Sequence, residues 1–242
     1  MIYIKSKNSN DLFIDVSIKL LNDGEIISPR GLKTLELQHV WLELTNPGNS
    51  IVSLKSRNAN KNYLKNELKW YLSGSLDAKD ITKHSKFWDK LKDSNGTINS
   101  NYGFLVLKEK FNGISQYEWC INSINNDVNT RQAVINYNQP KHKYDTNRDF
   151  VCTLAQHFMV RNGKLDSTVF MRSNDLIFGL TYDLPWFCLI QKRMAKNLNL
   201  KLGTYRHYAA SLHVYEKHFS MLKNISKEKY ARKTIHQQVQ DS

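Results

Sequence analysis

The stretch RSNDLIFG, from Arg172 to Gly179, carries residue types that can bind a charged ligand. Arg172 offers a guanidinium group, Ser173 a neutral hydrogen-bond donor and Asp175 a carboxylate, all placed just before an apolar run. The alternative is an exposed ion pair between Arg172 and Asp175, and such pairs contribute little to stability. We expect the stretch to bind something charged.

The three cysteines, Cys120, Cys152 and Cys188, are the next candidates for chemistry. Their number is odd, they are widely spaced and none forms a CxxC pair. The sequence therefore indicates neither a disulfide framework nor a zinc site, and no metal site is expected. A special cysteine is expected to be a nucleophile. Taken alone, Cys152 lies in the apolar run FVCTL, where a cysteine is more often a buried small side chain.

The formal net charge of +13 allows three interpretations. These are binding to nucleic acid, binding of a small anionic substrate, or a basic surface that is merely solvated. Lysines are spread from Lys5 to Lys233 without a dense block, and no nucleic-acid-binding module accompanies them. Direct nucleic-acid binding is therefore not expected, whereas a phosphorylated substrate fits the charge.

No apolar run approaches the length of about 18 to 20 residues that a membrane span needs. The first residues also lack the long apolar stretch of a secretory signal. We therefore expect a cytoplasmic protein without a membrane partner.

The chain of 242 residues can bury one substantial core, so a single domain over residues 1–242 is expected. Its polar tail from about Lys227 is a candidate for a flexible lid. The periodicity of apolar residues predicts helices, the last of which opens on Pro185, at 11–24, 60–74 and 184–200. Alternation predicts strands at 32–44, 131–138 and 167–175. This mixture indicates an α/β protein of the α+β type, with helices packed on a sheet.

Five motifs occur in the order and at roughly the spacing of the thymidylate synthase family: NELKWYLSG, INSNYG, FVCTLAQHF, MRSNDLIFGLTYD and SLHVYEKHF. The chain resembles this family from about Leu12 to about Phe219, and most closely its deoxycytidylate hydroxymethylase branch. Several motifs in order are more specific than any one alone. The resemblance implies one domain, with a mixed sheet covered by helices and a homodimer formed through the sheet.

The resemblance implies that Cys152 is the nucleophile. Carbon 5 of a pyrimidine is barely nucleophilic, and a thiolate that adds to carbon 6 makes carbon 5 enolate-like. Glu67 is implied to organise water and move protons, and Tyr102 to belong to the water network near carbon 5. On their own, a helical glutamate is usually solvated and a tyrosine beside a glycine is usually packed.

The resemblance also implies contacts to a nucleotide. Arg30, Arg172 and Ser173 match positions that bind the phosphate, which suits the fork geometry of guanidinium groups. His213 and Tyr215 match positions that hold the sugar 3′-hydroxyl, and their alternation on a strand points them the same way.

Arg131 is implied to reach across the dimer interface into the phosphate site of the neighbouring subunit. Many relatives have two consecutive arginines here, whereas this chain has Arg131 followed by Gln132. The departure removes one charged contact, for which Arg148 is a candidate replacement.

Asp183 matches a position where resembling thymidylate synthases have asparagine. An asparagine amide can donate to uracil O4 and accept from uracil N3–H, whereas an ionised aspartate only accepts. It is therefore expected to accept from the 4-amino group of cytosine, and the substrate is expected to be dCMP. The alternative is a helix N-cap just before LPWF.

The implied one-carbon donor is 5,10-methylenetetrahydrofolate. Trp88 is a candidate partner for its flat pterin, Asp175 for the pterin N–H groups, and Gly179 for the same site. No phosphate-cradling glycine loop of the GxGxxG or P-loop kind occurs, so a nucleoside triphosphate is not expected.

The last choice is between hydroxymethylation, in which water adds to the transferred carbon, and methylation of dCMP or dUMP. Thr153 stands where synthases often have histidine, and the segment ISKEKYARKT is not an apolar closing tail. Both features favour hydroxymethylation. A non-catalytic nucleotide-binding scaffold is the third interpretation, against which the complete set of Cys152, Arg172, Glu67 and Asp183 argues.

Overall fold

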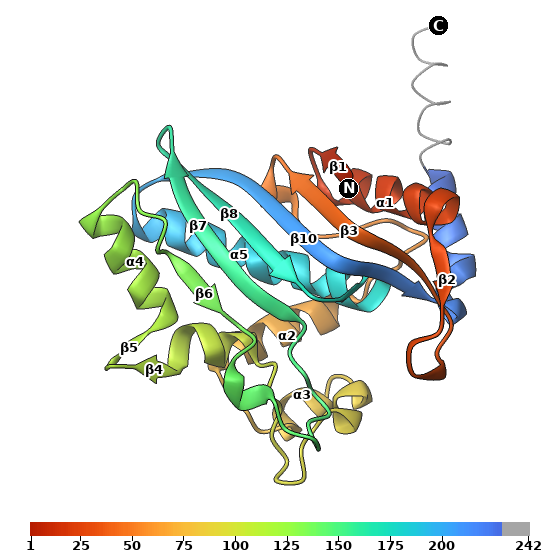
Figure 1. Cartoon of the computed structure of the whole chain (residues 1–242), viewed down its shortest axis with the longest axis horizontal. Coiled ribbons are helices and arrows are strands. Elements are labelled where there is room, and N and C mark those ends of the chain that lie inside the picture. Colours follow the sequence, from red (N-terminus) through yellow and green to blue (C-terminus); the bar gives the residue numbers. More distant parts are fainter. Residues whose placement is uncertain (229–242) are drawn as a thin grey trace, which may run out of the picture. The chain divides into compact units, whose positions relative to one another are not determined.

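The computed structural model describes residues 1–228, and the chain folds into two compact units (Figure 1). Unit 1 contains Met1–Ala59, Arg172–Cys188 and, as far as residue 228, Gly203–Ser242. Unit 2 contains Asn60–Met171 and Leu189–Leu202. The single domain over 1–242 remains a prediction. The expected lid from about Lys227 lies, from residue 229 onward, outside the described residues.

Unit 1 is built on a mixed sheet. Its helix α1 and its strands β1, β2, β3 and β9 span Ser9–Asp23, Ile2–Ser6, Glu25–Ile27, Thr34–Leu44 and Asn174–Asp175. It also contains all but the first two residues of β10, Lys201–Tyr215. Strand β1 runs parallel to β3, while β2 and β10 run antiparallel to β3. Strand β9 pairs in parallel with β10.

Helix α1 lies along β1 and β3 and covers part of this sheet (Figure 1). It begins after Asn8, whose side chain accepts from the Asp11 N–H at 3.0 Å, as an N-cap does. It ends at Gly24, where a Cβ atom would lie 2.5 Å from the Leu20 carbonyl oxygen. Its buried stripe consists of Leu12, Phe13, Val16 and Leu20. The helix expected at 11–24 is therefore confirmed.

Unit 2 combines helices with an antiparallel sheet of β6, β7 and β8. Its helices α2, α3 and α4 span Lys61–Ser73, Lys79–Thr82 and Gln116–Asn126. Its strands β4 to β8 span Lys110–Phe111, Ile114–Ser115, Val134–Asn136, Thr153–Arg161 and Lys164–Met171. Helix α2 ends at Gly74 in the left-handed conformation, φ 69°, which glycine adopts without strain.

Helix α5, Thr181–Asn197, begins in unit 1 and ends in unit 2. The expected start at Leu184 was wrong by three residues, because a wider helical turn, Leu176–Leu180, leads directly into the helix. Pro185 is therefore its fifth residue, where the missing N–H removes only the first hydrogen bond of the helix.

Two of the expected strands are shorter than predicted. Only Val134–Asn136 of the strand expected at 131–138 forms, and the strand expected at 167–175 is broken at Arg172 and Ser173 into β8 and β9. The strand expected at 32–44 is confirmed as β3. Helices with a mixed sheet confirm the expected α+β class. Within residues 1–228, no helix has the length and apolar character that crossing a membrane requires.

Candidate functional site

The residues singled out by sequence are divided between the two units. Unit 1 carries Arg30, Arg172, Ser173, Asp175, Gly179, Asp183, His213 and Tyr215. Unit 2 carries Glu67, Trp88, Tyr102, Arg131 and Cys152. The local geometry of each set follows from its own unit.

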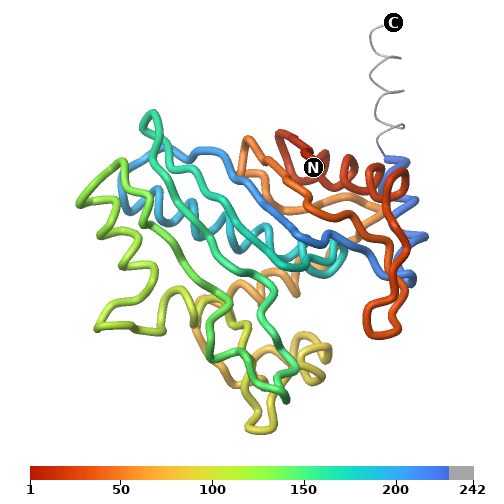
Figure 2. The backbone as a smooth tube through the Cα atoms, in the orientation of Figure 1, coloured from red at the N-terminus to blue at the C-terminus, as the bar shows by residue number. Residues whose placement is uncertain are grey.

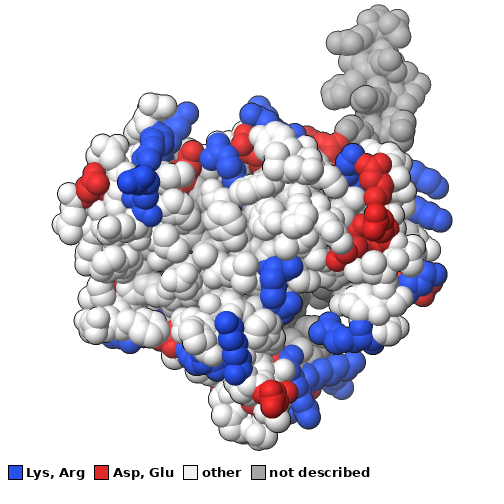
Figure 3. All heavy atoms as spheres, viewed as in Figure 1, with Lys and Arg blue, Asp and Glu red and all other residues white. Residues whose placement is uncertain are grey.

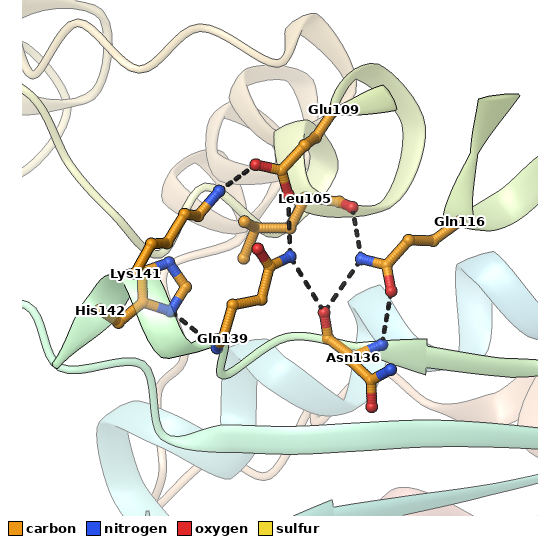
Figure 4. A network of polar contacts seen from close by, with 7 residues as sticks. All are labelled: Leu105, Glu109, Gln116, Asn136, Gln139, Lys141 and His142. Atoms are coloured by element: carbon orange, nitrogen blue, oxygen red, sulfur yellow. Dashed lines mark hydrogen bonds and ion pairs between the residues drawn. The ribbon is translucent and has the colours of Figure 1, made fainter. Parts of the chain in front are cut away.

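In unit 2, the connection from β6 to β7 leads to Cys152 and is anchored at its start (Figures 2 and 4). The Gln139 side chain donates to Glu109 Oε2 at 2.8 Å, and its backbone N–H donates to His142 Nδ1 at 3.1 Å. Gln116 accepts from the Asn136 N–H at 2.7 Å and donates to the Asn136 carbonyl oxygen at 2.9 Å. Burial lowers the pKa of His142, which keeps Nδ1 available as an acceptor.

The same connection is anchored again just before Cys152. Asp149 accepts from the Ser100 N–H at 2.6 Å and from the Ser100 hydroxyl at 2.9 Å. Burial raises the pKa of Asp149, although the bonds from Ser100 oppose that rise. The Asn138 side chain donates to the Val151 carbonyl oxygen at 2.8 Å. These bonds hold the backbone on the N-terminal side of the candidate nucleophile.

Cys152 differs from the other two cysteines in its environment. Cys120 and Cys188 are buried, and burial raises the pKa of Cys120 to about 12 and that of Cys188 further still. Cys152 is only partly buried, and its sulfur lies 3.9 Å from the Phe150 carbonyl oxygen. A nucleophilic cysteine needs a thiol that a substrate can reach and that can ionise. The two buried thiols, Cys120 and Cys188, do not meet these conditions.

Tyr102 contacts Thr153, the residue that follows the candidate nucleophile Cys152. The Thr153 hydroxyl donates to the Tyr102 hydroxyl at 2.9 Å, and the Tyr102 ring stacks on Tyr71 at 5.3 Å with an angle of 13° between the rings. A Cβ atom on Gly103 would lie 1.5 Å from the Tyr71 carbonyl oxygen, so only glycine allows this close packing. Packing thus fixes a hydroxyl beside the residue that follows Cys152.

Glu67 is 4% exposed, so it is not the solvated helical glutamate of the alternative interpretation. The Tyr63 hydroxyl donates to Glu67 Oε1 at 2.6 Å, and the Trp88 indole N–H donates to the Tyr63 oxygen at 2.9 Å. Sequence reasoning did not single out Tyr63 and missed this contact. Trp88 is 7% exposed, so little of its ring surface remains for a pterin.

In unit 1, Asp175 caps the turn Leu176–Leu180. Its Oδ1 accepts from the Ile177 N–H at 2.6 Å and from the Phe178 N–H at 3.1 Å. The capping role proposed for Asp183 therefore belongs to Asp175, and Asp183 lies inside the first turn of α5. The N-cap alternative for Asp183 was wrong because the helix starts before it.

Asn174 Nδ2 donates to Asp183 Oδ2 at 2.8 Å. Asn174 is 2% exposed, and sequence reasoning did not single it out. A Cβ atom on Gly179 would lie 2.8 Å from Asn174 Nδ2 and 3.3 Å from Asp183 Oδ2. Gly179 therefore leaves room for this pair, which is a structural reason for a glycine at that position.

The Asp183 carboxyl is surrounded densely enough that burial raises its pKa to about 7, even though the residue keeps some exposed surface. The bond from Asn174 opposes this rise, and the charge of Asp175 adds to it. The sequence interpretation assumed an ionised carboxylate. Both protonation states are accessible near neutral pH.

The buried residue Arg57 forms hydrogen bonds to the turn Leu176–Leu180 and to Thr181 after it. Sequence reasoning did not single it out. It is 4% exposed. Its Nη2 donates to the Ile177 carbonyl oxygen at 2.7 Å, and its Nε donates to Thr181 Oγ1 at 3.1 Å. Its guanidinium carbon lies 5.9 Å from the ring centre of Phe178 and 5.7 Å from that of Tyr182. A buried arginine with such contacts ties both ends of the turn together.

His213 and Tyr215 lie on one face of β10, as their alternation predicted. Their rings are perpendicular, with centres 5.3 Å apart. Neither His213 Nε2 nor the Tyr215 hydroxyl has a hydrogen-bond partner among residues 1–228. Two open polar groups side by side can hold one hydroxyl group of a ligand.

The expected phosphate contacts of unit 1 lie where the backbone leaves regular structure. Arg30 is exposed and has φ 53°, in the turn Pro29–Gly31. Arg172 and Ser173 are partly buried at the break between β8 and β9. Such breaks free side chains from the alternation of a strand, so they can turn toward a ligand.

Arg131 is exposed in unit 2, at one side of an open cavity of about 590 Å³. The cavity is lined by Asp127, Asn129, Thr130, Arg131, Gln132 and Arg161. Gln132, which stands in place of a second arginine, lines the same cavity. Its backbone carbonyl oxygen accepts from the Trp119 indole N–H at 3.1 Å. The expected reach of Arg131 across a dimer interface stays a prediction.

One face of the β7 and β8 pair is only partly covered in the described chain. Its weakly charged part consists of Ala155, His157, Met159, Thr168 and Phe170, and the charged residues Arg161, Lys164 and Asp166 lie on the same face toward the β7–β8 turn. Figure 3, which views the molecule as Figure 1 does, shows few charged atoms over these strands. A sheet face of this kind is suited to contact with another protein surface.

Comparisons with known proteins identify the family to which the chain belongs. The family model described as thymidylate synthase matches residues 12–241. A deoxycytidylate 5-hydroxymethyltransferase of Enterobacteria phage T4 is 33% identical over 175 residues, which is 67% of this chain and 70% of the relative. A deoxyuridylate hydroxymethyltransferase of Bacillus phage SP01 is 32% identical over 84% of this chain and 56% of the relative.

The fold itself also matches a solved structure. The thermostable thymidylate synthase A from Bacillus subtilis superimposes with a TM-score of 0.75, over 90% of this chain and 84% of that one, at 22% identity. At this identity the match concerns the fold alone.

The difference between the three cysteines predicts selective alkylation. A thiol reagent should modify one cysteine in the folded protein and all three after unfolding, because burial keeps the other two thiols protonated and out of reach. Intact-mass spectrometry counts the labels. Cys152→Ser should remove the label of the folded protein, and a second rapid label would contradict this assignment.

The raised pKa of Asp183 predicts how stability depends on pH. The folded state keeps this proton up to about pH 7, while the unfolded chain releases it near the ordinary value of 3.8. The unfolding free energy of the wild type should therefore fall as pH rises between these values, by at most about 1.4 kcal/mol per unit, relative to Asp183→Asn. Urea unfolding measures this difference. Asp145→Asn, at an exposed position, should follow the wild type, and parallel curves for wild type and Asp183→Asn would contradict the burial of this carboxyl.

Proposed function

Because the chain belongs to the thymidylate synthase family, whose members transfer one-carbon units, we propose that it hydroxymethylates dCMP. In this proposal a one-carbon unit passes from 5,10-methylenetetrahydrofolate to carbon 5 of dCMP and water adds, giving 5-hydroxymethyl-dCMP and tetrahydrofolate. The observation that carries the choice of base is the partly buried pair of Asn174 and Asp183. The 33% identity to a deoxycytidylate 5-hydroxymethyltransferase supports it.

Base recognition follows from the free oxygen of Asp183. Oδ2 is occupied by Asn174, and Oδ1 has no partner among residues 1–228, so Oδ1 is the atom that meets the group at carbon 4 of the base. When ionised, it accepts from the 4-amino group of cytosine and repels O4 of uracil. A partly desolvated site of this kind discriminates strongly, because the wrong base leaves a charge unpaired.

The nucleophile of the proposal is Cys152. Its thiolate adds to carbon 6 of the base, and the electron pair of the 5,6 double bond becomes available at carbon 5. The donor supplies a one-carbon unit at the oxidation level of formaldehyde. Elimination of the Cys152 thiolate at the end restores the aromatic base. The hydrogen bonds of Asp149 and Asn138 hold the connection that ends at Cys152.

Glu67 is assigned the transfer of protons. Its Oε1 is held by Tyr63, which Trp88 holds in turn, so the carboxylate is oriented within a buried chain of donors. The pair of Thr153 and Tyr102 supplies two hydroxyl groups that can order a water molecule. Ordered water is required at carbon 5, both to remove its proton and to add to the transferred carbon.

The remaining contacts of the proposal bind the rest of the nucleotide. Arg30, Arg172 and Ser173 are assigned to the phosphate, where guanidinium groups form charge-assisted hydrogen bonds. His213 Nε2 and the Tyr215 hydroxyl are assigned to the sugar hydroxyl, because both are open and adjacent.

The residues of unit 1 fit the folate donor better than Trp88 does. Asp175 uses Oδ1 as a cap, so Oδ2 is available to accept from pterin N–H groups. The Phe178 ring is 54% exposed and sits beside Gly179, which gives a flat apolar surface. Trp88 is assigned only an edge contact, because its ring is almost fully buried and its N–H is engaged.

A second candidate is hydroxymethylation of dUMP. The pKa of about 7 at Asp183 favours it under mildly acidic conditions, since a protonated Oδ1 can donate to uracil O4. The 32% identity to a deoxyuridylate hydroxymethyltransferase points to the same substrate. In our account cytosine is preferred at and above neutral pH.

The active assembly of the proposal is a homodimer formed through the sheet. The partly covered, weakly charged face of β7 and β8 supports this arrangement (Figure 3). Arg131, exposed at an open cavity, is assigned to the phosphate site of the partner subunit.

The proposed reaction is tested by its products. The protein is incubated with 5,10-methylenetetrahydrofolate and either dCMP or dUMP, the nucleotides are weighed by mass spectrometry, and absorbance reports dihydrofolate. We expect hydroxymethyl-dCMP without dihydrofolate, and Asp183→Asn should lower the ratio of kcat/KM for dCMP over dUMP at least about 100-fold. A methylated product with dihydrofolate would instead identify a synthase, and Cys152→Ser should abolish turnover of either nucleotide.

The shared site predicts complementation between inactive variants. Equal mixing of Cys152→Ser and Arg131→Ala proteins, with exchange of subunits, should yield mixed dimers and complete roughly a quarter of the sites. Activity recovered over the unmixed variants is the measurement. Lys79→Ala, at another exposed cation of unit 2, should stay active alone, and no recovery would contradict the role of Arg131.

A further inference from the structure

Glu36, Ser211 and His213 form a chain of contacts on neighbouring strands of unit 1. The Ser211 hydroxyl donates to Glu36 Oε1 in a short hydrogen bond, and the Ser211 oxygen lies 3.5 Å from His213 Nδ1. Glu36 on β3 is opposite His213 on β10 in the antiparallel register. Gln38 Nε2 donates to the other oxygen, Glu36 Oε2, at 3.4 Å.

The direction of the hydrogen bond between Ser211 and Glu36 decides the direction of the contact between Ser211 and His213. A hydroxyl has one proton, and Ser211 gives its proton to Glu36, so its oxygen can only accept from His213 Nδ1. The backbone of Ser211 also forms a hydrogen bond with the His213 ring. The Ser211 hydroxyl oxygen favours a proton on Nδ1.

Opposing effects act on the pKa of His213. Burial lowers its pKa and is the largest cause, and the positive charge of Arg30 acts in the same direction. Asp175 on β9 and Glu36 on β3 oppose this shift. A neutral ring with its proton on Nδ1 carries a lone pair on Nε2, which is the atom without a partner among residues 1–228.

The order of these groups also excludes a serine nucleophile. In a hydrolytic triad the histidine lies between serine and carboxylate and takes the serine proton. Here the serine lies between histidine and carboxylate, and its proton already points to Glu36. The chain of contacts is therefore suited to orient the histidine and not to activate the serine.

We propose that Glu36, acting through Ser211, is a positioning residue that holds the proton of His213 on Nδ1 and presents Nε2 as an acceptor to a ligand hydroxyl. The proposal rests on the proposed function only in naming that hydroxyl as the sugar hydroxyl of the nucleotide. The tautomer itself is a property of the protein alone.

Nitrogen NMR of protein labelled with ¹⁵N-histidine tests the tautomer directly. The His213 signals are assigned by their loss in His213→Gln. The wild type should show a protonated Nδ1 and an unprotonated Nε2. In Glu36→Ala, Ser211 is free to donate to Nδ1, so the proton should move to Nε2, whereas Glu36→Gln keeps an acceptor and should retain the wild-type tautomer.

Two further variants make the result decisive. Ser211→Ala removes the acceptor without a change of charge and should weaken the Nδ1–H preference. Glu25→Gln, at the exposed residue opposite Glu36 on β2, removes the same charge without a bond to Ser211 and should leave the tautomer unchanged. A wild type protonated on Nε2, or a tautomer that is the same in Glu36→Ala, overturns the proposal.

Kinetics provides the second readout. Glu36→Ala should raise KM for dCMP about 3- to 10-fold, the effect of one lost neutral hydrogen bond, with kcat nearly unchanged. Recovery of KM in Glu36→Gln supports positioning, and a KM unchanged in Glu36→Ala overturns it. If the protein acts on no nucleotide, the proposed function fails while the NMR result still decides the tautomer.

Discussion

The hydrogen bond from Asn174 to Asp183, 2.8 Å long, is the contact on which the proposed base recognition depends. It occupies one carboxyl oxygen and leaves the other open. Gly179 makes the contact sterically possible, and Arg57 ties together the turn that precedes it. Burial of a carboxyl group is unfavourable for its charge, and it raises the pKa of Asp183 to about 7.

The chemistry proposed for Cys152 depends on a backbone connection, between β6 and β7, that hydrogen bonds hold in place. Asp149 anchors the connection to Cys152, and neutral donors orient the buried carboxylate of Glu67. Buried polar groups of this kind are costly unless they are satisfied, so they specify one arrangement of the site. The nucleophile therefore needs no regular secondary structure of its own before β7 begins at Thr153.

The sequence predicted the elements that have a strong local signal, and its assignment of residues to the chemistry stays a prediction. The helix closed by Gly24 and the strand Thr34–Leu44 were found because their periodicity is regular. Arg57 and Asn174 were missed, since their roles come from contacts with residues 9 to 124 positions away, which no local pattern encodes. Tyr63 and Glu67 are neighbours one helical turn apart, but the burial that gives their contact its role comes from the tertiary fold. The start of α5 was misplaced because Pro185 is a strong local signal for a helix start, whereas a capped turn begins the helix earlier.

The most direct test of base recognition is the equilibrium binding of dCMP and dUMP to Cys152→Ser protein, which binds without turnover. Titration calorimetry at neutral and mildly acidic pH measures both affinities. Our account predicts tighter binding of dCMP at neutral pH, a smaller preference in acid, and loss of the preference in the double variant that also carries Asp183→Asn. Equal affinities for dCMP and dUMP at neutral pH would contradict the assignment of Asp183 to the base.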